Sequence, residues 1–278
     1  MISLLEMYDI TTGNRTVLKE FDNHMEAPNW MPDGNSLIYN AGGQICRYDL
    51  ATGESIHIPT GSCTSCNNDH VVSADGKNLA ISSGTGDNPV SRVWVLPITG
   101  GEPRLVTEKQ PSYLHGWSPD GKALAYCADR DGNYDVYTIS VEGGAEARLT
   151  TAPGLDDGPE FSPDGKHIWF NSVRSGLMQA WRMNADGSNQ TRMTHDDSMN
   201  VWFPHVSPDG QKVVTVCYYK GDVAPGDHPP LKNIEVRMMD ADGQNSVTLF
   251  KAFGGQGTMN VNSWSPDSQK FAFVTYRV

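Results

Sequence analysis

A short turn related to Ser-Pro-Asp-Gly recurs six times in this chain of 278 residues and constrains its fold more than any other feature. Proline presets the backbone angle φ, aspartate accepts hydrogen bonds from nearby amides, and glycine tolerates a positive φ, so each copy should form a tight turn between two strands. Copies of a motif separated by a regular interval of about 20 to 50 residues indicate a repeat architecture, in which each repeat is one supersecondary unit. The copies are centred on Asp33, Asp75, Asp120, Asp164, Asp209 and Asp267, at spacings of 42, 45, 44, 45 and 58 residues.

A second family of glycine-containing turns, such as Gly143-Gly144, also occurs six times and joins a third strand to a fourth in each repeat. The chain opens with a third-and-fourth-strand hairpin at residues 4–18 and closes with a first-and-second-strand hairpin at residues 260–276. Together these two hairpins complete one four-stranded sheet, which closes a ring and removes free sheet edges. No stretch shows the 3.6-residue period of a helix. We therefore predict an all-β, six-bladed β-propeller of four-stranded antiparallel blades, a single domain over residues 1–278 in which the N-terminal strands complete the C-terminal blade.

The Trp-Ser-Pro-Asp-Gly-Lys sequence at residues 117–122 and its variants resemble the repeats of TolB-type β-propellers. The resemblance extends over essentially the whole chain and implies the six-bladed fold. It implies less about function, because related propellers serve as periplasmic scaffolds, as gating domains of prolyl oligopeptidases and as oligogalacturonate lyases. The sequence contains neither the additional N-terminal domain of TolB nor a hydrolase domain, so we do not expect a translocation or gating role.

Charge and hydropathy limit the classes of binding partner and the cellular compartments that we expect for this protein. The formal net charge of −12 argues against nucleic acid or an anionic membrane surface as a partner. No run approaches the roughly 18 apolar residues of a membrane helix, and the N-terminus lacks the basic and apolar regions of a signal peptide. Three of the five cysteines, Cys46, Cys127 and Cys217, fall within strand-like runs, where free cysteine commonly behaves as a small apolar residue, and this pattern favours a reducing compartment. We expect a cytoplasmic protein, or a periplasmic one if a leader has been removed, with no membrane insertion.

Three histidines lie in the irregular segments that enter the innermost strands, on the face where we expect function. His70 and His115 precede the serine of their turns by three residues, and His205 precedes its serine by two. Because equivalent positions in different blades converge near the ring axis, these imidazoles should meet around one opening. Neutral imidazoles suit Zn²⁺ or Mn²⁺, and the related oligogalacturonate lyases imply a histidine-rich metal site at the propeller centre. The alternative interpretation is structural: the histidines cap strands and bond to loop carbonyls.

Polar and aromatic side chains accompany these histidines, a combination that suits a carbohydrate or another small polar molecule. A long segment at residues 218–232, between the second and third strands of the fifth blade, should project on the same face as a rim or lid. A merely decorative insertion is the alternative. Our candidate ligand-binding residues are Glu26, Asn68, Asp69, Tyr113, Asp157, Trp202, His228 and Gln256.

Three functions remain open at this point. The first is a stand-alone TolB-like propeller that binds a small polar molecule, a saccharide or a protein partner near the central opening. The second is a metal-dependent lyase or hydrolase acting on an acidic or polar saccharide, with His115 or His70 as the base and the metal stabilising the developing oxyanion. The third is a protein-interaction scaffold in which the pocket is incidental. Whether the protein is an enzyme is therefore left open.

Overall fold

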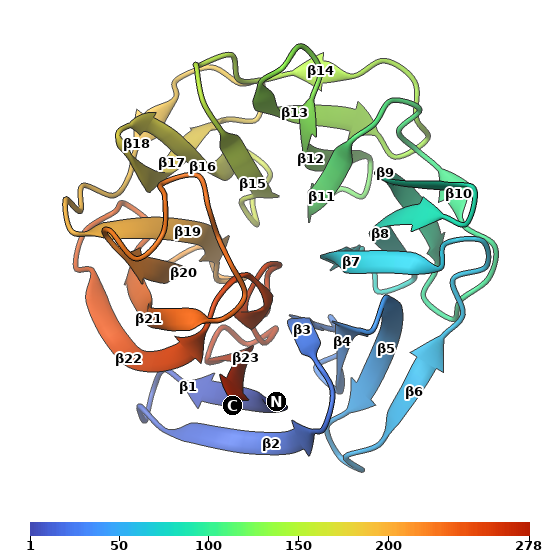
Figure 1. Cartoon of the computed structure of the whole chain (residues 1–278), viewed down its shortest axis with the longest axis horizontal. Coiled ribbons are helices and arrows are strands. Elements are labelled where there is room, and N and C mark those ends of the chain that lie inside the picture. The colour runs from blue at the N-terminus through green and yellow to red at the C-terminus, as the bar shows by residue number, and fades with distance from the viewer.

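Strand-forming runs separated by tight turns produce 23 β-strands and one short 3-10 helix, arranged as six blades around a central axis (Figure 1). The computed structural model describes all residues from 1 to 278. The predicted all-β, six-bladed β-propeller is confirmed. No helix in the structure has the length and apolarity needed to cross a membrane.

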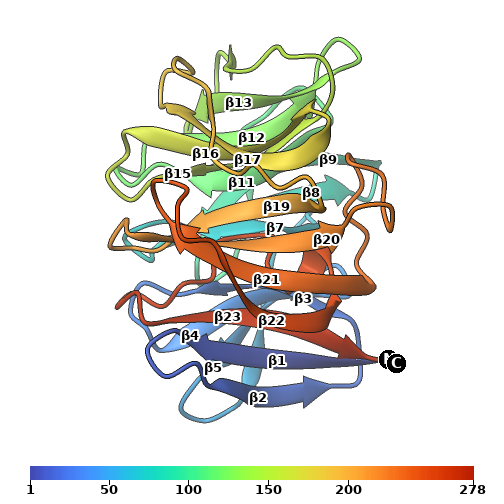
Figure 2. The same ribbon diagram turned by 90° about the vertical axis from the view of Figure 1, so that its left-hand side faces the viewer.

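Five blades each contain four antiparallel strands in chain order from the axis outward. Figure 2 shows the blades from the side, stacked as successive layers. Their strands are β3 (Met25–Trp30), β4 (Ser36–Ala41), β5 (Gln44–Asp49) and β6 (Ser55–Ile58); β7 (Ser65–Val72), β8 (Asn78–Thr85), β9 (Asn88–Pro97) and β10 (Arg104–Leu105); β11 (Ser112–Trp117), β12 (Ala123–Asp129), β13 (Tyr134–Ser140) and β14 (Ala147–Arg148); β15 (Asp156–Phe161), β16 (His167–Ser175), β17 (Leu177–Asn184) and β18 (Thr191–Arg192); β19 (Met199–Val206), β20 (Lys212–Tyr219), β21 (Lys232–Asp240) and β22 (Val247–Gly254).

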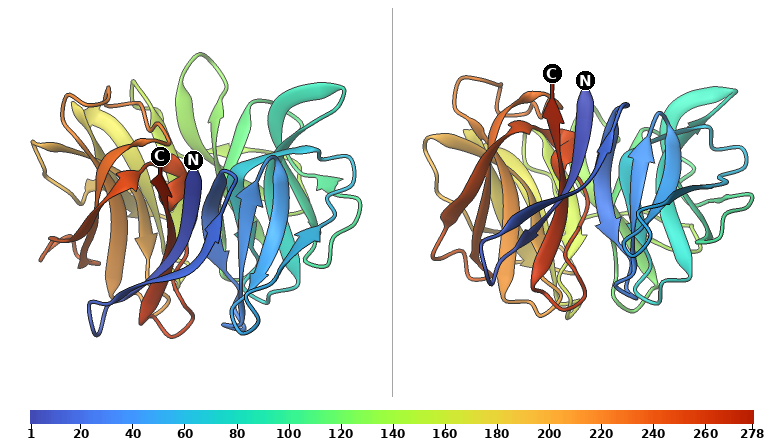
Figure 3. Two further views of the ribbon diagram at one scale, coloured as in Figure 1. Left: turned by 60° about the horizontal axis from the view of Figure 1, so that its bottom comes forward. Right: turned by 90° about the horizontal axis from the view of Figure 1, so that it is seen from below.

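The sixth blade joins the two ends of the chain, as the two terminal hairpins predict. β1 (Ile2–Asp9) pairs on one side with β2 (Arg15–Phe21) and on the other with β23 (Lys270–Arg277). Figure 3 shows the two termini side by side at this closure. The innermost position is held by a segment that joins β23 only through a bridge between Trp264 and Phe271. Asn262, within this segment, donates a hydrogen bond from its side-chain amide to the carbonyl of Val206 in the neighbouring blade.

The repeated turns show why serine and aspartate recur at fixed positions. In the copy at residues 118–121, Ser118 Oγ donates to Asp120 Oδ1 at 2.7 Å, and the same carboxylate oxygen accepts the amide of Lys122 at 3.1 Å. Gly121 adopts φ 75°, a value that other residues rarely accept. These contacts are local, so the turn forms wherever the motif occurs.

The apolar core lies between neighbouring blades. The largest cluster joins the fifth and closing blades through buried side chains such as Trp202, Trp264 and Phe271. Burying one such phenylalanine contributes about 1.5 to 3 kcal/mol to folding. Because the blades pack on both faces, the second strand of each of the first five blades is buried almost continuously, as in Leu124 to Ala128 of β12.

Each innermost strand from β3 to β19 is interrupted by a shift in register at the end nearest the blade connections. In three blades a residue in the left-handed conformation lies at this point and is followed by proline: Ala27 (φ 54°), Gly158 (φ 60°) and Phe203 (φ 52°). Such bulges re-aim the side chains around them. They therefore decide which residues of the innermost strands face the ring axis.

Candidate functional site

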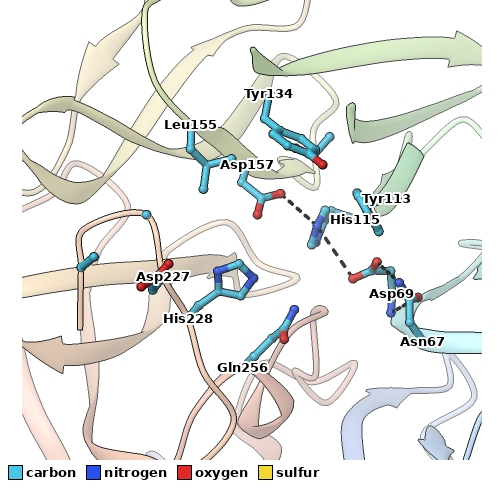
Figure 4. A pocket seen from close by; sticks show the side chains of 13 residues that line it. Asn67, Asp69, Tyr113, His115, Tyr134, Leu155, Asp157, Asp227, His228 and Gln256 are labelled. Carbon is cyan, nitrogen blue, oxygen red and sulfur yellow. Dashed lines mark hydrogen bonds and ion pairs between the residues drawn. The ribbon is translucent and has the colours of Figure 1, made fainter. Parts of the chain in front are cut away.

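A cavity of about 590 Å³ lies on the face of the ring that carries the connections between blades (Figure 4). Its wall includes side chains from the innermost strands β7, β11 and β15 of three successive blades. The β12–β13 hairpin, the loop at residues 220–231 between β20 and β21, and the helix η1 (Gln256–Thr258) also contribute to the lining. This is the face on which the sequence predicts the irregular segments, opposite the Pro-Asp-Gly turns.

The centre of this cavity holds a histidine between two aspartates from other blades. His115 Nε2 lies 3.2 Å from Asp157 Oδ1 and 3.9 Å from Asp69 Oδ1. The side chains of these three residues are only 4 to 10% exposed. Asp69 is oriented by two amides, because Asn260 Nδ2 donates to its Oδ1 at 2.6 Å and Asn67 Nδ2 donates to its Oδ2 at 2.7 Å. We call Asp69, His115 and Asp157 the acid–histidine chain.

The charges of the acid–histidine chain depend on one another. Burial by itself lowers the pKa of His115, but the charge and hydrogen bond of Asp157 and the charge of Asp69 outweigh it and raise that pKa to about 9. Burial raises the pKa of Asp157, yet the charge and hydrogen bond of His115 hold it well below its usual range. For Asp69 burial is the dominant effect, and its pKa rises to about 6. At neutral pH the acid–histidine chain therefore contains one imidazolium and two carboxylates.

This charge state limits the chemistry available in the cavity. A general base must be unprotonated at the working pH, so the raised pKa of His115 argues against that role and favours a hydrogen-bond donor. Burial raises the pKa of Tyr113 to about 12 and that of the Cys127 thiol well above its usual range. Neither group is therefore an activated nucleophile.

The predicted meeting of three histidines does not occur. His70 is fully buried in the β7 strand, does not line the cavity, and makes no hydrogen bond through either ring nitrogen. Burial lowers its pKa to about 4, so it remains neutral. His205 is also buried, with Nδ1 2.6 Å from Glu160 Oε2 and Nε2 3.0 Å from the Met259 carbonyl oxygen. For His205 the structural interpretation, in which histidines bond to neighbouring groups, describes the geometry better.

Bulges in the innermost strands are the reason that the three histidines do not meet. Residues that lie at a similar distance from the repeated turn point in different directions, because the strands shift register at Cys66/His70, Leu114/Gly116 and Trp202/His205. His115 consequently lines the cavity, whereas His70 and His205 do not. No group of three or more His, Cys, Asp or Glu side chains is arranged to hold a metal ion. The residues present do not fit the three-histidine Zn²⁺ or Mn²⁺ site that the sequence suggests.

Three of the candidate ligand-binding residues lie outside the cavity lining. Glu26 Oε1 lies 3.0 Å from His24 Nε2 and accepts a bond from Asn68 Nδ2 at 3.4 Å. Trp202 is completely buried, and its ring lies behind His228 with 4.3 Å between the ring centroids. These side chains support the wall of the cavity instead of facing its interior.

The long segment of the fifth blade reaches the cavity, as the sequence predicts. Asp227 and His228 of this loop line the cavity opposite the acid–histidine chain (Figure 4). Tyr218 Oη donates to the Pro229 carbonyl oxygen at 2.9 Å, and this bond fixes the end of the loop. Of the candidate residues, Asp69, Tyr113, His115, Asp157, His228 and Gln256 all line the same space.

Sequence reasoning missed four lining residues that come from different parts of the repeat. Asn67 precedes Asp69 on β7, and Leu155 lies just before β15. Cys127 and Tyr134 flank the β12–β13 turn, which lies on the same face as the entry to the innermost strand. Their position at that end of the hairpin is a signal that could have identified them.

Comparison with known proteins supports a family assignment. Residues 71–226, more than half of the chain, match the model of the TolB beta propeller domain. A protein of Agrobacterium fabrum, named only as uncharacterized, is 48% identical over 277 residues, which cover 99% of this chain and 93% of that protein. A solved structure from Agrobacterium tumefaciens, described as a candidate TolB, has a TM-score of 0.95 and 47% identity, and the match covers 100% of this chain and 99% of that one.

A more distant structure bears on the enzymatic alternative. An oligogalacturonate lyase in complex with manganese has a TM-score of 0.57 and 14% identity, over 90% of this chain and 67% of that chain. At this identity the similarity concerns the fold alone. The family model, the full-length relative and the TolB-type repeats together establish that this chain belongs to the TolB β-propeller family.

Proposed function

We propose that this protein binds a small polar molecule in the cavity on its loop-rich face. The observation that carries the proposal is the acid–histidine chain, a set of three charged and almost fully buried side chains that line an accessible cavity. Transferring each ion from water to a protein interior costs several kcal/mol. Charged groups kept in a cavity at that cost, with mutually shifted pKa values, are typical of ligand sites.

The cavity has the size and lining that such a function requires. Its volume of about 590 Å³ falls within the range of about 300 to 1,000 Å³ that is usual for ligand pockets. Tyr113, Tyr134 and Leu155 supply apolar surface, while Asn67 and Gln256 supply amide groups that both donate and accept hydrogen bonds. The loop at residues 220–231 forms one wall and would limit access of water to a bound molecule.

The geometry does not favour the metal-dependent lyase or hydrolase. That mechanism needs several imidazoles that converge on one metal ion. Of the two histidines that line the cavity, His115 is protonated and lies between Asp157 and Asp69, and His228 lies on the loop opposite. As the setting of the binding function we propose the cytoplasm, because all five cysteines are free thiols and four of them are buried.

Thermal denaturation with a panel of small polar compounds tests this function. The panel contains neutral sugars, polyols, uronates, amino acids and amines. A ligand at 100 times its Kd stabilises the folded state by about 2.7 kcal/mol, which for a chain of this size raises Tm by at least about 5 °C. We expect at least one compound class to produce such a rise.

A matched pair of variants ties the effect to the cavity. Ala224→Trp places a large side chain in the wall of the cavity, and Ala51→Trp places the same side chain on an exposed turn of the opposite face. The rise in Tm should disappear in Ala224→Trp and persist in Ala51→Trp. The proposal is wrong if no compound raises Tm, or if Ala224→Trp responds like the wild type.

A further inference from the structure

We propose that the ligand of this cavity carries a positively charged amine or guanidinium group, which binds the second carboxylate oxygen of Asp157. This inference rests on the proposed binding function and specifies the chemical class of its ligand. Four observations support it: the charge balance of the lining, an unpaired carboxylate oxygen, an unpaired imidazole nitrogen and two tyrosine rings.

The lining has an excess of negative charge that the protein does not neutralise. Three carboxylates, those of the buried Asp69 and Asp157 and of the solvent-exposed Asp227, line the cavity, and no lysine or arginine lines it. His115 is the only cation among the lining residues, so two negative charges remain without a counterion. An anionic ligand such as a uronate or a phosphate would add to this repulsion in a medium of low dielectric constant. A cationic ligand would relieve it.

Asp157 has an oxygen available for such a cation. The two nitrogen atoms that contact its carboxylate both lie at Oδ1, which is 3.2 Å from His115 Nε2 and accepts the Gly158 amide at 2.7 Å. Oδ2 accepts no hydrogen bond from a nitrogen or hydroxyl group of the protein, although the side chain is nine-tenths buried and lines the cavity, and the Cys127 thiol lies beside this carboxylate. Figure 4 shows this oxygen directed away from His115, into the space above His228. A carboxylate oxygen that faces a largely enclosed cavity can accept a hydrogen bond from a ligand, and an N–H group of a cation would supply it.

His228 and Gln256 provide further acceptors on the other side of the same space (Figure 4). Burial lowers the pKa of His228, so its imidazole is neutral and keeps an acceptor nitrogen. Its Nδ1 is buried and has no hydrogen-bond partner in the protein. An ammonium group has three donors and no acceptor. The carboxylate oxygen, an imidazole nitrogen and an amide oxygen together match that donor set.

The aromatic wall adds a second attraction that is selective for cations. The rings of Tyr113 and Tyr134 line the cavity with their centroids 6.4 Å apart. The negative face of a tyrosine ring attracts a cation within about 6 Å of its centroid. A neutral sugar could also contact these rings, but it would leave the excess negative charge of the lining unopposed.

Isothermal titration calorimetry with ligands of matched shape and different charge tests the inference. The probes are glucosamine, glucose and glucuronate, with agmatine and 1,4-butanediol as a linear pair. We expect the cationic member of at least one series to bind at least tenfold more tightly than its neutral partner, with no measurable binding of glucuronate. Raising the salt concentration from 50 to 500 mM should weaken binding of the cation.

Two substitutions localise the effect. Asp157→Asn should reduce the affinity for the cationic probe at least tenfold, and Asp227→Asn, which leaves the acid–histidine chain intact, should reduce it by a smaller factor. Glu54→Gln removes one exposed carboxylate far from the cavity and should leave the affinity unchanged. Circular dichroism establishes that each variant is folded.

The possible failures are distinguishable. If the neutral probe binds as tightly as the cation in both series, if glucuronate binds as tightly as glucosamine, or if neither aspartate substitution weakens binding of the cation, the cationic class is refuted while a ligand-binding function stands. If no probe and no member of the wider panel binds, both the inference and the binding function are wrong.

Discussion

Replacing His115 by glutamine should change how the stability of this protein depends on pH. His115 has a pKa of about 9 in the folded state and an ordinary value of 6.5 when unfolded. A histidine with a raised pKa contributes stability fully below pH 6.5, and this contribution falls as the pH rises and is lost above about 9. A tenfold change in a protonation equilibrium is worth about 1.4 kcal/mol, so the difference between these two pKa values sets an upper limit of about 3 kcal/mol.

The total effect of the substitution should be close to this limit at pH 6.5. His115→Gln leaves Asp69 and Asp157 close together without the cation that separates them. Removing one partner of a buried ion pair typically costs about 3 to 5 kcal/mol. We therefore expect the variant to be about 3 kcal/mol less stable than the wild type at pH 6.5, and to approach the wild type at pH 9.5, where the histidine has lost its proton.

Urea denaturation at pH 6.5, 7.5, 8.5 and 9.5 measures this difference directly. The free energy of unfolding of the wild type minus that of His115→Gln should decrease steadily across the series. Deprotonation of cysteines in the unfolded chain affects both proteins equally and cancels in the subtraction. His57→Gln, an exposed position on β6, serves as the control and should show a difference near zero at every pH. A difference that stays constant, or that grows with pH, would refute a protonated His115.

Three further substitutions test other parts of the structure. Glu160→Ala removes a buried carboxylate that accepts bonds at 2.6 Å from both His205 and Asn262. Urea denaturation should show that the free energy of unfolding falls by about 3 kcal/mol. The control Glu142→Ala, at an exposed position, should reduce it by less than about 0.5 kcal/mol. Asn171→Ala removes the side chain that bonds the Val201 carbonyl oxygen at 3.0 Å and the Phe203 amide at 2.9 Å, and the two orphaned backbone groups should reduce stability by about 2 kcal/mol. Gly255→Ala adds a methyl group that overlaps the Pro229 carbonyl oxygen, so it should displace the loop and weaken calorimetric binding of a cavity ligand by at least tenfold; unchanged affinity would mean that the loop does not contribute to the site.

Much of the site could be located from the sequence because the repeat fixes the direction of every strand. Once the Pro-Asp-Gly turns are placed on one face, the blade connections must lie on the other. This reasoning placed Asp69, Tyr113 and His115 at one end of the innermost strands, and it placed His228 on a loop above them. All four line the cavity.

The prediction was wrong where it assumed that residues the same number of positions before the turn point in the same direction. His70 and His115 both precede their serines by three residues, yet only His115 faces the cavity. A bulge adds or removes a residue within a strand, and a change of one residue reverses the face to which the side chains point. The sequence contains no simple pattern that reports where each bulge falls.

The six turns, the number of blades and the closure of the ring were determined by the sequence alone, since each turn is stabilised by contacts within about five residues and the two incomplete terminal hairpins complement each other. The charge of His115 and the shape of the cavity were decided by the tertiary structure. The negative charges of Asp69 and Asp157 keep His115 protonated, and these two residues lie on other blades, more than 40 residues away along the chain. Electrostatic interactions between buried groups depend on distances of a few ångströms, and only the closed ring brings these three side chains within that range.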